Sequence, residues 1–468
     1  MEGQTPEVAP ATDEPTAGRT RRRTREVRLR TDVLWSLLLA AAAVLLSVLG
    51  VLGGTQISAL DEHTHLDYAY KVSQGELPYT GVPLSDYTLE EWSCRGQQSI
   101  ADALPPCEEA AADEVAPSDY PARGENYNAW HPPLYYATAA GAGLVAEALG
   151  QSFTTGARLS GGLWLAAAVV AMYGVLRHWR LRPALAASGA AVIMAVPSIV
   201  HASSTVTNDA PAALLGVGAL WVLTRVFRDG RTGWFAWVLP TVIAALAASI
   251  KLMSSVAILT AVGVVALSAL PQLRDRNWGE AVRRLLIAVV PVLAVGASAV
   301  AWSAFQSGRA VESWTNPIAG VNTAPVTGAP FDEWAPTLTS AFGLVDDFYV
   351  QPELMSSLIW LSVGALTVLL TAAPFMALVT FRPGQAERVV GWAALIGAVA
   401  VPLLVQGQEF LRGGGYFRGV SARYAVTLVP MTIAALTLVA HERRYQVLAY
   451  VVAVCGYLAM LLSFSGIA

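Results

Sequence analysis

A succession of apolar runs, each about as long as a membrane is thick, dominates this chain of 468 residues. The first run, residues 33–54, has about 22 residues, and crossing a hydrocarbon core takes about 20. It exceeds the apolar core of a signal peptide, which has about 7–15 residues. Only 14% of the residues are charged, against roughly 25% in a soluble domain. The sequence therefore predicts an all-α integral membrane protein. The further runs are 159–177, 183–203, 210–227, 233–250, 252–270, 285–305, 356–380, 389–406, 422–440 and 445–466.

The distribution of arginine sets the expected topology. The partly apolar stretch 131–149 is ambiguous, because counting it as a span would place the arginines of the 177–182 turn outside. As an interfacial helix on the outer face, it leaves about eleven spans and puts 21 of the 30 cationic residues inside, in keeping with the positive-inside rule. We therefore expect a multi-pass cell-membrane protein with a cytoplasmic N-terminus. The weakest part of the pattern is the pair 233–250 and 252–270, which only Lys251 separates.

The chain divides into a tail and a transmembrane domain. Residues 1–31 are rich in Pro, Thr, Glu and Arg and predict a disordered cytoplasmic tail. Residues 32–468 form the predicted transmembrane domain, with outer segments at 55–157, 306–355 and 407–421. The inner turns are short, and long loops usually carry function. We therefore expect the working face to be outside.

Three cysteines exclude a disulfide-rich scaffold and a four-cysteine zinc site. Cys94 and Cys107 share the first outer segment, where an oxidising compartment would favour a disulfide between them. Cys455 lies in an apolar run and is expected to be a small buried residue. The net charge of −4 gives no reason to expect nucleic acid as a partner.

Acidic and histidine side chains follow the first span, in the order Asp61-Glu62-His63-Thr64-His65. Ionised groups at a membrane boundary are costly unless they are solvated or used. A carboxylate here is therefore a candidate base for an attacking hydroxyl. A solvated helix end stays open as the alternative, and the two histidines also allow a metal site.

A second motif runs from Asn128 to Tyr136 and contains His131 and paired prolines, which suit the start of a helix. Its aromatic residues Trp130, Tyr135 and Tyr136 suit a membrane interface. Both a membrane anchor and the wall of a site fit these rings.

Cations recur at the same outer boundary, together with acidic and polar neighbours. The set comprises Arg158, Asn208, Asp209, Lys251, Arg423 and Tyr424. Cations at this level suit a phosphate whose lipid tail stays in the bilayer, and carboxylates suit a hydroxyl-bearing acceptor that arrives from water. The alternative for each cation is that its side chain snorkels to the lipid headgroups.

In their order, these motifs resemble those of the GT-C superfamily, which are integral-membrane glycosyltransferases that use polyprenyl-phosphate sugars. The nearest likeness is to a bacterial multi-span branch whose first loop reads Asp-Glu-x-x-His, and it covers roughly residues 33–440. The features that carry it are Asp61-Glu62, His131-Pro-Pro-Leu-Tyr-Tyr, Asn208-Asp209, Lys251, Arg423-Tyr424, and Phe342-Gly343 before Asp346-Asp347.

The resemblance implies a role for several site residues. The implied roles are catalytic for Asp61 and Glu62 and donor-phosphate binding for Lys251, Arg423 and Arg158. We also expect substrate binding by the polar residues at the same level, His65, His131, Asn208, Asp209 and Tyr424. Some members of the superfamily need a divalent cation such as Mg, Mn or Ca and others do not. No dedicated metal site is predicted, and the cation is left open.

The expected activity is transfer of a hexosyl or pentosyl group, with inversion, from a polyprenyl-phosphate donor to an envelope glycan, lipid or protein outside the membrane. A lipid or glycan flippase and a non-catalytic scaffold of envelope assembly are the alternatives. The composition is rich in Arg and poor in Lys, which is typical of GC-rich actinobacteria. That source makes arabinose and mannose the candidate sugars.

Overall fold

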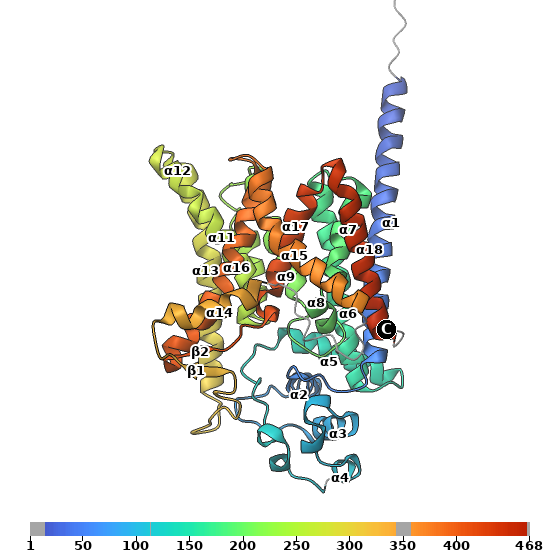
Figure 1. Cartoon of the computed structure of the whole chain (residues 1–468), viewed down its shortest axis with the longest axis vertical. Coiled ribbons are helices and arrows are strands. Elements are labelled where there is room, and N and C mark those ends of the chain that lie inside the picture. Colours follow the sequence, from blue (N-terminus) through green and yellow to red (C-terminus); the bar gives the residue numbers. More distant parts are fainter. Residues whose placement is uncertain (1–14, 113, 343–356, 466–468) are drawn as a thin grey trace, which may run out of the picture.

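The computed structural model describes residues 15–112, 114–342 and 357–465 and shows a helical bundle with a smaller lobe at one end (Figure 1). Within these ranges, eight helical segments are long and apolar enough to cross a membrane. This confirms the predicted all-α membrane fold. The segments fall in α1 (Pro15–Gly53), α6 (Phe153–His178), η6 to α12 (Leu252–Ser255, Val256–Leu267 and Ala269–Arg274), α13 (Trp278–Ser307), α15 (Ser357–Thr380), α16 (Ala386–Gly413), η9 and α17 (Ala422–Leu428 and Val429–Val439), and α18 (Arg443–Ser465).

The other predicted spans form shorter helices, so the count of eleven stays a prediction. The stretch 183–203 breaks at Pro197, whose ring lacks an N–H and starts a new helix. The pieces are α7 (Pro183–Ala191), η4 (Val192–Ala195), α8 (Pro197–Ala202), α9 (Ala212–Leu223) with the π turn η5 (Thr224–Arg228), and α10 (Val238–Ala248).

The N-terminal segment differs from its prediction. Helix α1 begins at Pro15, so residues 15–31 are helical and not an irregular tail, whereas residues 1–14 lie outside the described part. Arg and Glu have high helix propensity, and here they extend the helix that the apolar run forms.

The lobe is built from the first predicted outer segment. Its elements are α2 (Glu62–Ser73), α3 (Asp86–Arg95), η1 (Gln98–Ala103), α4 (Cys107–Ala111), η2 (Pro117–Asp119), η3 (Pro121–Gly124) and α5 (Leu134–Ala148). At 15 residues, α5 is shorter than the candidate spans, in keeping with its interpretation as an interfacial helix.

Two of the cysteines form a disulfide and the third is exposed. A Cys94–Cys107 disulfide joins α3 to α4 in the lobe. The prediction that Cys455 is buried is wrong, because the side of α18 that carries it points away from the helices on which α18 packs.

The predicted outer segments meet at the lobe end of the bundle (Figure 1). Strand β1 (Thr323–Pro325) pairs antiparallel with β2 (Gly415–Phe417), with Thr323 opposite Phe417. The Gln306 side-chain amide donates to the carbonyls of Pro78 and Ala129, and α14 (Pro330–Phe342) packs on α16. The Gly343, Asp346 and Asp347 part of the motif lies outside the described residues.

The predicted inner turns also contact one another. Arg177 pairs with Asp32 at 2.7 Å, and both His178 and Arg225 reach Asp229. Segments assigned to one side by charge therefore do lie together. Which side of the membrane each faces stays a prediction.

Candidate functional site

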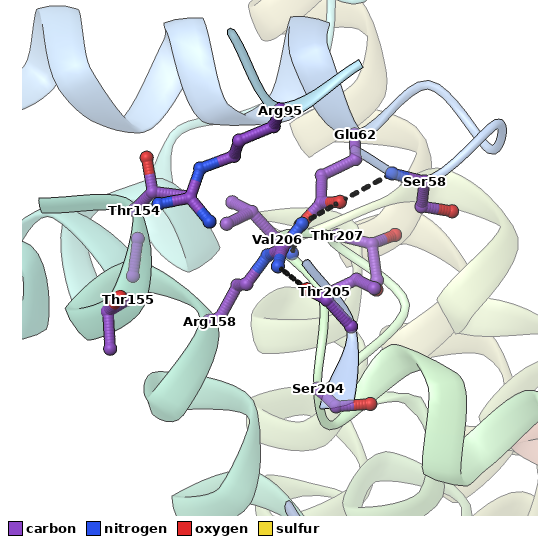
Figure 2. A network of polar contacts seen from close by, with 12 residues as sticks. Ser58, Glu62, Arg95, Thr154, Thr155, Arg158, Ser204, Thr205, Val206 and Thr207 are labelled. Carbon is purple, nitrogen blue, oxygen red and sulfur yellow. Dashed lines mark hydrogen bonds and ion pairs between the residues drawn. The ribbon is translucent and has the colours of Figure 1, made fainter. Parts of the chain in front are cut away.

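A buried ion pair joins the lobe to the bundle at the start of α2. Figure 2 shows Glu62 facing Arg158, with Ser58 and the 204–207 turn around them. Arg158 Nε and Nη2 each lie 2.8 Å from a Glu62 oxygen, and the two residues are only 2% and 1% exposed. Glu62 also accepts the backbone N–H groups of Ser58 and Val206, at 2.7 and 2.8 Å.

These contacts leave little capacity for a substrate. Arg158 donates further to the carbonyls of Gly54 and Gln56, so its guanidinium is surrounded by protein acceptors. The geometry therefore does not support the predicted phosphate-binding role of Arg158 or the predicted catalytic role of Glu62. A bidentate pair of this kind fixes geometry, and here it fixes where α2 begins.

Asp61, the residue before, is in a different setting. Its side chain is 26% exposed, and its backbone is left-handed, with φ of 62°, which is uncommon for a residue other than glycine. Its Oδ1 accepts the Tyr127 hydroxyl at 2.9 Å, and its Oδ2 lies 3.5 Å from Arg423. Asp61 is therefore the carboxylate of the first motif that remains accessible.

Lys251 and Arg423 reach the same site from two distant segments. Lys251, between α10 and η6, contacts Asp209 at 2.6 Å. Lys251 Nζ lies 5.8 Å and the Arg423 guanidinium 5.4 Å from the centre of the Tyr424 ring. Tyr424 therefore lies near both cations. Each cation in turn pairs with a carboxylate, Arg423 with Asp61 and Lys251 with Asp209.

A polar wall formed by the other predicted substrate residues adjoins this charge cluster. His65 Nδ1 lies 2.7 Å from the Tyr136 hydroxyl, and Asn208 Nδ2 lies 3.3 Å from the same oxygen. The rings of His65 and His131 are 6.0 Å apart between centres. The motifs thus converge, although they are far apart along the chain.

The aromatic residues of the second motif divide between the two interpretations. Tyr135 and Tyr136 are fully buried, so they are not interfacial anchors. Tyr136 forms part of the polar wall, and the Tyr135 hydroxyl accepts the backbone N–H of Thr207 at 2.9 Å. Trp130 is 47% exposed and fits a membrane anchor.

Sequence reasoning missed Tyr127 and assigned no role to His63. Tyr127 lies between η3 and α5 and contacts both Asp61 and His63. It stands one residue before the second motif, and a single tyrosine in a polar loop carries no pattern that would single it out.

Burial and nearby charges shift the pKa values of the first motif. Burial alone would raise the pKa of Asp61, but Arg423 and the Tyr127 hydrogen bond lower it, joined in acid by the protonated His65 and His63 rings. Burial lowers the pKa of His63 and of His65 to about 4, against the opposing pull of Asp61. At neutral pH the site therefore holds an ionised Asp61 and neutral histidines.

The donor set does not fit a resident divalent cation. Asp61, Glu62 and Asp209 each pair with a cationic side chain. Across the described ranges, no group of three or more His, Cys, Asp or Glu side chains is arranged to hold a metal ion.

The fold and the site together define a multi-span helical membrane protein with a charged site where its bundle meets the lobe. Over residues 135–315, the chain matches the family described as dolichyl-phosphate-mannose-protein mannosyltransferase. The match confirms the resemblance to GT-C membrane glycosyltransferases. It includes Asp209 and Lys251 but not Asp61 or Arg423. No curated protein matches the chain significantly.

Among solved structures, the chain is similar to the Archaeoglobus fulgidus oligosaccharyltransferase tethered through a disulfide to an acceptor peptide with an NVT sequon. The identity is 14% and the TM-score is 0.42. The similarity covers 92% of this chain and 55% of that one, so this chain spans about half the length of that enzyme.

Proposed function

We propose that this protein transfers a sugar from a polyprenyl-phosphate donor to a hydroxyl group of an acceptor at the outer face of the cell membrane. One observation carries the proposal. Asp61, an accessible carboxylate, shares a site with Arg423 and Lys251 at the lobe end of the bundle. The match to a mannosyltransferase family supports the proposal and favours mannose as the sugar.

The proposed reaction is a single displacement. The acceptor oxygen attacks the anomeric carbon, the bond from that carbon to the phosphate oxygen breaks, and the bonding electrons leave with the phosphate. Attack opposite the leaving group inverts the anomeric centre, as in other one-step glycosyl transfers. The hydroxyl proton passes to the Asp61 carboxylate, which its lowered pKa keeps ionised at neutral pH.

Lys251 and Arg423 stabilise the phosphate as it gains negative charge. An ammonium has three N–H donors, and the Asp209 contact occupies one of those of Lys251. Asp209 therefore orients Lys251 and leaves it able to bind a phosphate oxygen. No step requires a metal ion, because two cationic side chains supply the positive charge.

The polar wall suits the hydroxyls of the sugar. His131 Nδ1 and Asn208 Oδ1 are buried, and neither has a hydrogen-bond partner in the described part of the chain. Buried polar atoms without partners are costly, and sugar hydroxyls can donate to both. We therefore assign His65, His131 and Asn208 to the sugar of the donor.

The extracytoplasmic location rests on charge and on the lobe itself. The Cys94–Cys107 disulfide lies in the segment that the arginine pattern places outside, where oxidising conditions preserve such bonds. The acceptor is accordingly proposed to be an envelope glycan, lipid or protein.

A reconstituted assay tests the proposal. The full chain in lipid nanodiscs is incubated with polyprenyl-phosphate mannose or arabinose, and with membrane extract as the acceptor. Labelled product with inverted anomeric configuration, seen by NMR, is the expected result. Movement of labelled lipid from one leaflet of a proteoliposome to the other, without sugar transfer, would identify a flippase. The absence of both sugar transfer and lipid movement, with either donor, would overturn the proposal.

A further inference from the structure

The contacts of Asp61 single out a residue behind the site. Tyr127 donates its hydroxyl proton to Asp61 Oδ1 at 2.9 Å, and the same hydroxyl lies 3.3 Å from His63 Nε2. A tyrosine hydroxyl has one proton, and Asp61 receives it. Tyr127 can therefore only accept from His63, whose Nε2 must carry a proton.

The tautomer of His63 agrees with its surroundings. With the proton on Nε2, Nδ1 is a bare acceptor, and this buried atom has no hydrogen-bond partner among the described residues. The His63 ring stacks on Trp92, with centroids 3.9 Å apart and planes 10° apart. The indole in turn donates to Gln97 at 2.9 Å. His63 is therefore held in one plane.

The backbone of Asp61 is fixed independently of its side chain. The Asp61 carbonyl accepts the backbone N–H groups of Thr64 and His65, and also the Thr64 hydroxyl. These hydrogen bonds hold the backbone of Asp61 in its left-handed conformation, but they do not restrict rotation of its carboxylate. Tyr127 is the neutral donor that stops that rotation and leaves Oδ2 toward Arg423.

We propose that Tyr127, backed by His63 and Trp92, is a positioning residue that orients the Asp61 carboxylate so that Oδ2 receives the acceptor proton. The inference deepens the proposed function and rests on it. Tyr127 itself touches no reacting atom in the proposed reaction. It restricts which carboxylate oxygen meets the acceptor, and it stabilises the ionised form of Asp61.

Substitution of Tyr127 separates this role from simple packing. Tyr127→Phe keeps the ring and removes the hydroxyl, and we expect kcat to fall about tenfold with KM unchanged, as for loss of one orienting hydrogen bond. The remaining groups facing Asp61 are Arg423, His63 and His65. Because losing Tyr127 raises the pKa of Asp61, the acidic limb of the kcat profile should move to higher pH.

A matched control exists in the same lobe. Tyr120 is buried and, like His63, packs on Trp92. Its hydroxyl contacts Ser93 and the Leu89 carbonyl and not Asp61. Tyr120→Phe should leave the acidic limb where it is in the wild type. His63→Phe keeps the stacking on Trp92 and removes the N–H that faces Tyr127, so it should shift the acidic limb less than Tyr127→Phe does. His63→Gln should return the limb to its wild-type position.

A second readout does not depend on activity. The pH at which the protein is half unfolded by acid should be higher for Tyr127→Phe than for the wild type. The same substitution should cause no such rise when Asp61→Asn is also present. An unmoved acidic limb in an active Tyr127→Phe variant, or the same shift in Tyr120→Phe, would overturn the inference and leave the proposed function standing. If the wild type transfers no sugar, the proposed function fails, and equal unfolding shifts in both Asp61 backgrounds would overturn the positioning role separately.

Discussion

Two neighbouring carboxylates, Asp61 and Glu62, each pair with an arginine from a distant segment, yet their surroundings are opposite. Glu62 and Arg158 are sealed in protein, with four hydrogen bonds to the carboxylate. Asp61 and Arg423 are 26% and 22% exposed, and their atoms are 3.5 Å apart. A closed pair is suited to hold a fold together, whereas an open pair can exchange partners with a substrate. The comparison favours a structural role for the Glu62–Arg158 pair and supports the proposed role of Asp61 in transfer.

Asp61→Asn tests the open pair and has the largest expected effect. The amide keeps the shape and cannot take the proton, so we expect kcat to fall about 1000-fold, within the range for loss of a general base. Thermal unfolding should stay close to that of the wild type. Asp86→Asn, at an exposed acidic residue of α3, is the matched control. Turnover within tenfold of wild type would remove Asp61 from the reaction.

Glu62→Gln tests the closed pair. The change leaves the Arg158 charge buried without a counterion, which typically costs about 3–5 kcal/mol. Most of the protein should therefore fail to fold or should unfold at much lower temperature, as gel filtration and thermal scans in detergent would show. A stable but inactive Glu62→Gln variant would contradict this division of roles.

Lys251→Ala tests how the donor phosphate is held. We expect a loss of about 10- to 100-fold in kcat/KM for the donor, as for removal of one charge-assisted contact to a developing anion. Lys251→Arg should retain part of the activity, and Arg412→Ala, at an exposed cation of the same membrane end, should retain nearly all of it. Equal losses in Lys251→Ala and Arg412→Ala would show that the overall positive charge at this end of the molecule matters, and not a direct contact between Lys251 and the phosphate.

Mild acid should weaken the lobe before it affects Asp61. His63 and His65 are neutral when folded, with pKa values of about 4, but have values near 6.5 when unfolded. Protonation below pH 6.5 therefore favours unfolding, and stability should fall as the pH drops from 6.5 toward 4. The loss is about 2 kcal/mol per histidine at pH 5. Constant stability between pH 7 and pH 5 would show that these side chains are solvated.

Chelation should have the smallest effect. The carboxylates of the site pair with cationic side chains, so EDTA should leave transfer within twofold of the untreated rate. A chelated enzyme that recovers activity only with Mg, Mn or Ca would show that a metal ion displaces one of these ion pairs.

The sequence predicts the grouping of segments well, because bilayer thickness and arginine placement constrain every span in the same way. It also predicts that Asp61, Asp209, Lys251 and Arg423 share a membrane level, since each stands at the outer end of an apolar run. Spans that proline interrupts are less predictable, and the break at Pro197 shows why.

The sequence does not predict which of two adjacent carboxylates is buried. That outcome depends on Arg158, nearly a hundred residues downstream, and on the backbone N–H groups of Ser58 and Val206. The role of Tyr127 depends on the path of a loop across α2, and no local pattern records that path. Long-range contacts of this kind decide the roles of single residues within a site whose location is predictable.

The short ladder between β1 and β2 has a consequence for Arg423. Strand β2 ends at Phe417, and the next backbone N–H, of Arg418, donates to the Asn322 carbonyl at 3.0 Å. The chain then turns within a few residues into η9, which carries Arg423. The strand pair joins the segment after α13 to the chain that carries Arg423, and Trp314 of the same segment donates to Glu125 of the lobe at 2.7 Å. One segment therefore contacts both the lobe, which begins beside Asp61, and the chain that carries Arg423.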